Sequence, residues 1–371
     1  MGLDTYDVAI IGAGPAGACA AIMLAQQERS VALIERDTYP RKTRLFGWLN
    51  VRATDLLTKM GVATKGLLTE RIKEVVFHNA DFSKRVKPNL TESPGYLVDL
   101  GVLDNALVAR AVDCGVTLLN GCEAVDVDLA ESSATVRLRD GRDVKSRLLL
   151  LALGGGSTLA ERAGFPRLAR EQAAWSAVVE ESLKGASGNV PRVGIVLGLG
   201  NAESFGLYCV SKSRISVAVN WNRERGTTVT ALEHLCRSGF DHDAIPIDLS
   251  RKAAQGKPIR SPTSIALDLE SHVGKHTLLI GDAGGFVSAL SNEGVFPAMW
   301  SAQIAAEITR TALDSVHSQD ALMKFDSEWR IQMADYLRPP NTDNQFLLPL
   351  IFSNQPMADR MAAAFFWGEN I

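Results

Sequence analysis

The chain has 371 residues, 46% of them hydrophobic, which is enough for two packed domains or for one cofactor-binding domain with a large insertion. Its 39 Lys and Arg against 42 Asp and Glu give a net charge of -3, and no stretch gathers Lys and Arg with aromatic residues, so we expect no nucleic-acid partner. Five scattered cysteines without a Cys-x-x-Cys pair predict a reducing, cytoplasmic compartment and no structural zinc.

Near the start of the chain an apolar run leads into a glycine-rich turn, Gly12-x-Gly14-x-x-Gly17, and a second apolar run ends on Glu35. This order predicts a buried strand, a helix whose N-terminus faces a pyrophosphate, and a second parallel strand. The carboxylate that ends the second strand can accept hydrogen bonds from ribose hydroxyls and would repel a 2′-phosphate. The unit therefore predicts binding of FAD or NAD.

The apolar stretch around this turn is interpreted neither as a secretory signal nor as a membrane span. Asp4 and Asp7 precede it instead of positive charges. Glycines interrupt it before it reaches the roughly 18 apolar residues that a transmembrane helix needs. No other window is long and apolar enough, so we expect no transmembrane span.

The middle of the chain alternates between helical and strand-like patterns. A basic loop at 41–44 precedes a helix around Leu56, short alternating runs within 72–95 suit a second sheet, and helical spacing returns at 102–112. Four further strands are predicted, with Asp140-Gly141 as a hairpin turn between two of them. They cover residues 115–119, 125–129, 134–138 and 147–153.

The second half begins with strand-like and glycine-rich pieces from 175 to 265, which predict a mostly antiparallel sheet. Residues 276–280 then form a buried parallel strand, and Gly294 opens a long helix. A final helical region from about Ala321 is predicted to be broken by prolines. They are Pro339-Pro340, Pro349 and Pro356.

Several motifs follow one another in a fixed order. After the glycine turn and Glu35 come Pro40-Arg41-Lys42, then Gly-Asp-Ala-Gly-Gly-Phe-Val at 281–287, and then Asn292-Glu293-Gly294. This order resembles the para-hydroxybenzoate-hydroxylase-type flavoproteins, most closely their geranylgeranyl-reductase-like branch. The resemblance implies FAD as the cofactor.

The resemblance also implies where FAD is held. Asp282 would contact the ribityl chain or the pyrophosphate, and the backbone of Gly294 and Val295 would face the pyrimidine edge of the flavin. A helix N-terminus there stabilises negative charge on the reduced flavin. The implied cofactor contacts are Gly12, Gly14, Pro15, Ala16, Gly17, Glu35, Arg36, Arg44, Val125, Gly154, Gly281, Asp282, Gly294 and Val295.

The implied fold is α/β. A Rossmann-like, three-layer FAD-binding domain carries an inserted, mostly antiparallel substrate sheet and a helical C-terminus. The FAD-binding domain is predicted to be discontinuous, at 1–71, 96–165 and 265–315. The substrate domain is predicted at 72–95 and 166–264, and the C-terminal helical region at 316–371.

Two departures from the family pattern bear on the reaction. Aromatic hydroxylases have an aspartate, tied to nicotinamide use, where this chain has Leu153, and a flavin-contacting arginine is replaced by Leu100. Both changes weaken the case for a nicotinamide-driven phenol hydroxylase. No Trp-x-Trp element occurs, which disfavours a flavin-dependent halogenase.

No side chain is singled out as the catalytic group, because the flavin supplies the redox chemistry. Phe46 and Trp48 are candidates for stacking on a flat or polyene substrate, or else they belong to the core. Glu293 is either an acid or base near the flavin or a charge that offsets a helix N-terminus. The basic loop Arg41, Lys42 and Arg44 binds phosphate or an anionic substrate, or is a solvated turn.

The apolar C-terminus, 346–352 and 365–367, either packs on the core, lines a substrate tunnel or docks on a partner or membrane surface. We therefore predict an FAD-dependent oxidoreductase, with monooxygenation of an aromatic or apolar substrate mildly favoured. One alternative is reduction of an unsaturated apolar substrate. The other is modification of a partner protein, for example tryptophan hydroxylation in quinone-cofactor maturation. Electrons would come from NAD(P)H or from another external reductant.

Overall fold

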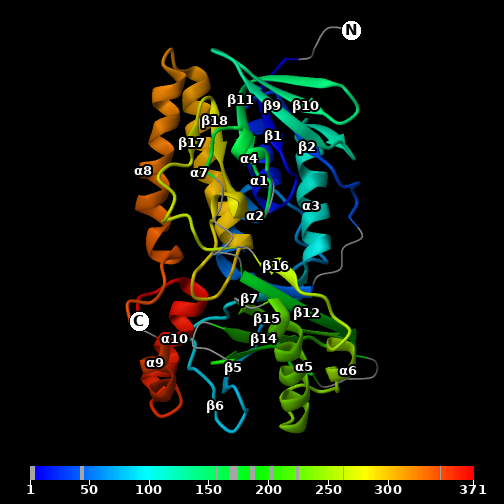
Figure 1. The fold of residues 1–371 in the computed structure, drawn as a ribbon, viewed down its shortest axis with the longest axis vertical. Coiled ribbons are helices and arrows are strands. Elements are labelled where there is room, and N and C mark those ends of the chain that lie inside the picture. Colours follow the sequence, from blue (N-terminus) through cyan, green and yellow to red (C-terminus); the bar gives the residue numbers. More distant parts are fainter. Residues whose placement is uncertain are drawn as a thin grey trace.

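The computed structural model contains two stacked sheet-and-helix regions (Figure 1). The structure describes residues 5–41, 46–155, 158–166, 174–183, 189–199, 204–222, 225–261, 263–342 and 344–371. In Figure 1 the upper region holds the N-terminal strands, and the lower region holds the sheet formed by the middle of the chain. None of the described helices has the length and apolarity needed to cross a bilayer.

The upper region is built on a largely parallel sheet with the order β17-β18-β11-β1-β2-β8. Its strands are β1 (Thr5–Ile11), β2 (Val31–Glu35), β8 (Thr117–Asn120), β11 (Asp143–Leu151), β17 (Val273–Gly274) and β18 (Thr277–Leu279). Ile11 lies beside both Ile34 and Leu151, so the carboxyl ends of three central strands meet at one edge. All of β2 and the carboxyl-terminal parts of β1 and β11 are buried, which explains the apolar runs at 8–11, 31–34 and 148–151.

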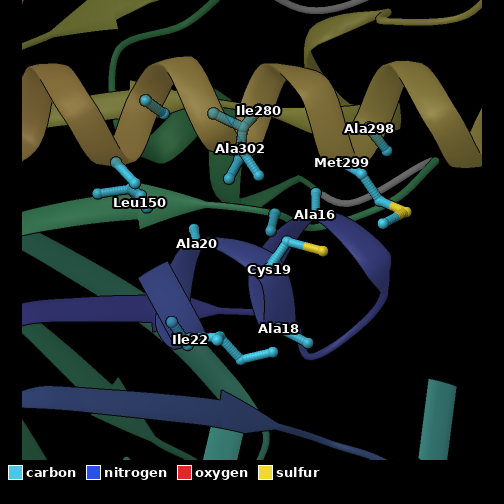
Figure 2. Packing of buried hydrophobic residues seen from close by; sticks show 14 of the residues in the cluster. Ala16, Ala18, Cys19, Ala20, Ile22, Leu150, Ile280, Ala298, Met299 and Ala302 are labelled. Atoms are coloured by element: carbon cyan, nitrogen blue, oxygen red, sulfur yellow. The ribbon is translucent and has the colours of Figure 1, made fainter. Parts of the chain in front are cut away.

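Helices cover one face of this sheet. They are α1 (Pro15–Ala25), α2 (Val51–Lys59), α3 (Leu100–Asp113), α7 (Val295–Asp314) and α8 (Ser318–Leu337). Figure 2 shows small side chains where α1 and α7 meet, among them Ala16, Ala20, Ala298 and Ala302. Because alanine is small, the two helices pack closely, and their N-termini come near the same sheet edge.

The opposite face is covered by the hairpin β9 (Ala124–Leu129) and β10 (Ala134–Leu138) and by the short helix α4 (Leu159–Arg162). The hairpin extends antiparallel from β11, as the Asp140-Gly141 turn predicts. Helices, parallel sheet and hairpin form the three layers, so the predicted Rossmann-like α/β class is confirmed.

The lower region is a second sheet with the order β16-β12-β15-β14-β13-β5-β6. Its strands are β5 (Glu74–Asn79), β6 (Arg85–Val86), β12 (Ala174–Ser182), β13 (Arg192–Leu197), β14 (Phe205–Val210), β15 (Arg214–Asn222) and β16 (Ile259–Ser261). All described pairs are antiparallel except β13 with β5. The predicted, mostly antiparallel inserted sheet is therefore confirmed.

One face of the second sheet carries α5 (Arg225–Asp241) and α6 (Ser250–Ala253), which the strand-like interpretation of 175–265 missed. β-branched residues at 227–230 weaken the helical signal of this segment. Tertiary packing stabilises helix α5 instead, because Leu232, Leu235 and Cys236 are fully buried against the sheet.

The other face carries α9 (Asn344–Ile351) and α10 (Gln355–Trp367), shown in red in Figure 1. Pro339-Pro340 separates α8 from α9, as predicted. The other two prolines do not break helices: Pro349 lies within α9, and Pro356 stands in the first turn of α10, where a missing N–H costs nothing. Met361, Phe365 and Phe366 are buried in the core of the second sheet, so α10 is a core helix.

A small sheet lies between the two regions. It contains β3 (Phe46–Asn50), β4 (Glu70–Arg71) and β7 (Gly95–Asp99) in the order β3-β7-β4. Residues of α8 belong to the core of the upper region, and residues of α10 belong to the core of the lower region. The predicted domain boundaries stay a proposal.

Candidate functional site

The glycine turn after β1 is forced by close backbone contacts. Gly12 has a φ of +101°, and a Cβ added there would lie 2.1 Å from the carbonyl oxygen of Ala152. A Cβ on Gly17 would lie 1.8 Å from the carbonyl oxygen of Gly12. Gly14 caps α1 without a side-chain hydrogen bond, and no acid stands in the first turn. The N-terminus of α1 therefore offers free N–H groups and positive potential to an anion.

Glu35 ends β2 directly beside this turn and is 4% exposed. Its carboxylate accepts hydrogen bonds from the N–H of Ala13 at 2.8 Å and of Asp37 at 2.9 Å. The guanidinium of Arg41 lies 2.9 Å from Glu35 and 3.0 Å from Asp104. Burial raises the pKa of Asp104 to about 6, although Arg41 opposes the rise. The backbone N–H groups of Ala13 and Asp37 therefore fix the Glu35 carboxylate at the place where we expect the ribose.

A third element reaches the same sheet edge from the end of β18. The chain there forms the short 3-10 helix η2 (Gly281–Gly284), which carries Asp282. Gly294, the N-cap of α7, packs on this carboxylate: an added Cβ would lie 3.0 Å from Asp282 Oδ1. Asp282 and the start of α7 therefore form one unit, as the resemblance implies for the flavin end of the site.

The fully buried His272 supports η2 from behind. Its Nε2 donates a hydrogen bond to the carbonyl of Gly284 at 2.8 Å. Asp326 of α8 accepts hydrogen bonds from the backbone N–H of His272 and from the hydroxyl of Ser271. Burial raises the pKa of Asp326, but hydrogen bonds from His272 and Ser271 outweigh this and hold it well below its usual range. Helix α8 thus holds in place the turn that presents Asp282.

These elements enclose a cavity of about 830 Å³, within the size range of pockets for large ligands. Eight of the predicted cofactor contacts line it: Gly12, Gly14, Pro15, Glu35, Arg36, Val125, Gly154 and Asp282. Ala16, Gly17, Gly281, Gly294 and Val295 are not on its lining. Among them, Gly281 packs on Ala16 beneath the cavity wall. Arg44 lies outside the described residues.

Some residues of the cavity wall were missed in the sequence. Glu123 and Arg139 form an ion pair at 2.6 Å, and Arg162 of α4, which pairs with Asp126 at 3.0 Å, also lines the cavity. The β9–β10 hairpin brings the first two together, and no local motif marks any of the three. Leu153, predicted at the end of a strand, follows β11 and also lines the cavity.

The predicted catalytic candidates lie away from this lining. Phe46 and Trp48, on β3, are each 8% exposed and belong to the core of the lower region. The ring centroid of Trp48 lies 4.9 Å from that of Phe366 and 6.1 Å from that of Phe365. Glu293 is buried between α2, α8 and α10. A catalytic role for these three residues stays a prediction.

A polar bridge joins the two regions next to Phe46. Arg214 of β15 forms ion pairs with Asp99 at 2.7 Å and with Glu180 at 3.1 Å, and its guanidinium lies 4.9 Å from the centre of the Phe46 ring. Asp99 also caps α3, just before Leu100. The guanidinium of Arg214 therefore lies close to Leu100, and Arg214 belongs to the second sheet.

The unliganded protein should lose stability as Asp282 ionises. Burial raises the pKa of Asp282 to about 6 from the ordinary aspartate value of about 3.9, so the folded chain binds this proton more tightly than the unfolded chain. Stability then falls as pH rises through the window between these two values. We expect Asp282→Asn to unfold at higher urea concentration than the wild type at pH 8, with a smaller difference at pH 5. An equal difference at both pH values would contradict this, and Glu123→Gln, which changes an exposed acid, is the control.

Comparison with known protein families decides the assignment. A family profile described as an FAD binding domain matches residues 5–288. The chain belongs to this FAD-binding family. FAD is its cofactor, and the protein is an FAD-dependent oxidoreductase of the para-hydroxybenzoate-hydroxylase-type superfamily.

Relatives of this FAD-binding protein include reductases. It is 27% identical over 335 residues to a menaquinone reductase of Mycobacterium tuberculosis strain H37Rv, covering 82% of this chain and 76% of the relative. It is 22% identical over 346 residues to a digeranylgeranylglycerophospholipid reductase of Methanocaldococcus jannaschii, covering 90% and 84%. A solved geranylgeranyl bacteriochlorophyll reductase-like protein of Thermoplasma acidophilum shares the fold, with a TM-score of 0.74 at 17% identity over 99% of this chain and 98% of that one.

Proposed function

We propose that this FAD-dependent oxidoreductase reduces a carbon–carbon double bond in an apolar, prenyl-type substrate. The observation that carries the proposal is the aromatic cluster around β3, where Phe46 and Trp48 meet Phe365 and Phe366. These rings are packed in the core of the lower region and are not on the lining of the described cavity, so they would contact a hydrocarbon chain where it enters the junction of the two regions. The names of the two curated reductases above support the same substrate class.

The roles of the chain in this reaction follow from the site. The N-terminus of α1 would bind the pyrophosphate, Glu35 the ribose, and Asp282 with Gly294 the flavin end. Bound, reduced FAD would supply the hydride for one carbon of the double bond, and solvent would supply the proton for the other carbon. The two electrons come from NAD(P)H or another external reductant. Leu100 and Leu153 favour a reductant other than a nicotinamide.

Monooxygenation, which the sequence alone favours, is the second candidate. The same aromatic cluster would protect an oxygen-activating reduced flavin from water. A third candidate function is modification of a partner protein, for which the apolar C-terminus would be a docking surface. The packing of α10 disfavours this role, because α10 is a core helix and removal of 345–371 would expose the second sheet.

An anaerobic turnover experiment separates the two reactions. We expect dithionite-reduced holoenzyme to convert geranylgeraniol or menaquinone, without oxygen, to a product heavier by two hydrogens. Because dithionite alone reduces the quinone ring of menaquinone, that product is re-oxidised to the quinone before its mass is measured. Product formed only after ¹⁸O₂ is admitted, and carrying one ¹⁸O atom, would instead establish monooxygenation. No anaerobic product from either probe would contradict the reductase proposal.

Truncating Phe46 should weaken binding of the apolar substrate. Its ring is buried between the Arg214 guanidinium and the second core, at the junction of the two regions. We expect Phe46→Ala to raise KM roughly tenfold with a smaller change in kcat, since the lost contact is with the unreactive part of the substrate. Phe240→Ala, on the outer side of α5, is the control. An unchanged KM would show that Phe46 serves only the core.

A further inference from the structure

The carboxyl group of Glu293 is buried in an unusual polar cluster. It is 6% exposed. Its Oε2 accepts hydrogen bonds from the hydroxyl of Tyr336 and from Asn50 Nδ2, the latter at 3.2 Å. Its Oε1 is buried and has no well-aligned hydrogen bond to the described residues, although the backbone N–H of Phe296, in the first turn of α7, lies near enough to the carboxyl group to lower its pKa. A buried carboxylate oxygen without a well-aligned donor destabilises the charged form of the group.

The donors around Glu293 are already shared with other acceptors. Asn50 Nδ2 lies 2.9 Å from the hydroxyl of Tyr336 and 2.8 Å from the carbonyl oxygen of Phe366, in addition to Glu293. One amide has two N–H groups for these three acceptors. Asn50 therefore has no N–H group to spare for Oε1. The cluster ties the start of α2 to α8 and α10.

This cluster lies directly behind the flavin end of the candidate site. Glu293 precedes Gly294, the N-cap of α7, and Gly294 packs on the Asp282 carboxylate that lines the cavity. The positive end of the α7 dipole, equivalent to roughly half a charge, would stabilise a reduced, anionic flavin. A negative charge at the same helix end would offset that stabilisation.

We propose that Glu293 is a positioning residue whose charge sets the reduction potential of bound FAD. Its neutral form leaves the α7 dipole free to favour reduced FAD, and its carboxylate form opposes reduction. Reduction of FAD is then coupled to proton uptake by Glu293. The inference rests on the proposed placement of the flavin at Gly294, but it does not depend on which substrate is reduced.

The surroundings of Glu293 place its protonation near neutral pH. Burial raises its pKa to about 7, while hydrogen bonds from Tyr336 and Asn50 oppose the rise. The titratable and charged groups that face it from the described elements are Tyr336 of α8 and Arg52 of α2. Helix α10 contributes the main-chain carbonyl of Phe366. Above pH 7 the carboxylate dominates, and the potential of wild-type FAD falls more steeply with pH.

The test is the midpoint potential of bound FAD in the holoenzyme, measured against reference dyes from pH 5.5 to 9. We expect Glu293→Gln, which is neutral at every pH, to match the wild type at pH 5.5. At pH 8.5 its potential should be higher by about 30 mV or more, which is a tenfold change for a two-electron couple. Glu307→Gln, an exposed acid of α7 that is not on the cavity lining, should follow the wild type throughout.

A second variant keeps the test decisive if Glu293→Gln fails to fold. Tyr336→Phe removes a donor that stabilises the carboxylate, so the bend in the plot of potential against pH should move to higher pH. Potentials of Glu293→Gln that coincide with the wild type, or that differ equally at all pH values, would overturn the inference. So would an unmoved bend in Tyr336→Phe. Wild-type protein that binds no FAD would refute the cofactor placement as well, whereas failure of the turnover assay alone would leave these potentials measurable.

Discussion

Gly17→Ala should prevent stable folding, whereas Gly14→Ala should leave the fold intact and weaken FAD binding. The new methyl group at position 17 would lie 1.8 Å from the main-chain oxygen of Gly12, so β1 and α1 would have to separate. Such a clash within a core turn costs about 4 kcal/mol or more, a large part of the stability of an ordinary domain. We expect the variant to be insoluble or to unfold at much lower urea concentration than the wild type.

Gly14 is the matched control for this effect. An added Cβ there meets no protein atom within 4 Å, and its φ of -69° suits alanine. The methyl group would project at the N-terminus of α1, where the pyrophosphate is expected to approach. Unfolding should therefore be unchanged, while the Kd for FAD should rise tenfold or more, equivalent to about 1.4 kcal/mol. Equal destabilisation of both variants, or unaltered FAD affinity in Gly14→Ala, would contradict this account of the turn.

Glu35→Ala should reduce both stability and FAD affinity. The substitution removes the acceptor of the Ala13 N–H and one of the carboxylates that pair with Arg41. Leaving a buried donor and a partly buried cation without this partner costs about 2–4 kcal/mol. Loss of the ribose contact should raise the Kd for FAD at least tenfold, which fluorescence titration of the FAD-free protein measures.

Glu123→Ala serves as the comparison, because Glu123 lines the same cavity but is exposed in its pair with Arg139. We expect its unfolding midpoint to stay close to that of the wild type. Glu35→Gln should recover part of the stability, since its amide oxygen can still accept the Ala13 N–H. A Glu35→Ala variant as stable as Glu123→Ala would show that the carboxylate does not hold the turn.

The first half of the candidate site could be predicted from the sequence because it is local. Gly12, Gly14, Gly17 and Glu35 lie in one strand–helix–strand unit, where spacing alone sets geometry. Asp282 is far from this unit in the chain, and only the resemblance to a known family indicated its place. The order of parallel strands then brings both segments to one sheet edge.

The parts that were missed depend on contacts between distant segments. Arg139 reaches the cavity through the pairing of β9 with β10, and Arg162 through the packing of α4. Helix α5 is hidden by β-branched residues and forms because it covers the second sheet. The cluster around Glu293 joins residues from four separate elements, so nothing in the local sequence shows that Tyr336 and Asn50 meet there.

A crystal structure of the protein with bound FAD would test where the cofactor lies. We predict electron density for the pyrophosphate at the N-terminus of α1, for the adenosine ribose at Glu35 and for the flavin beside Asp282 and Gly294. Density that places the flavin away from the N-terminus of α7, or the adenosine away from Glu35, would contradict the account.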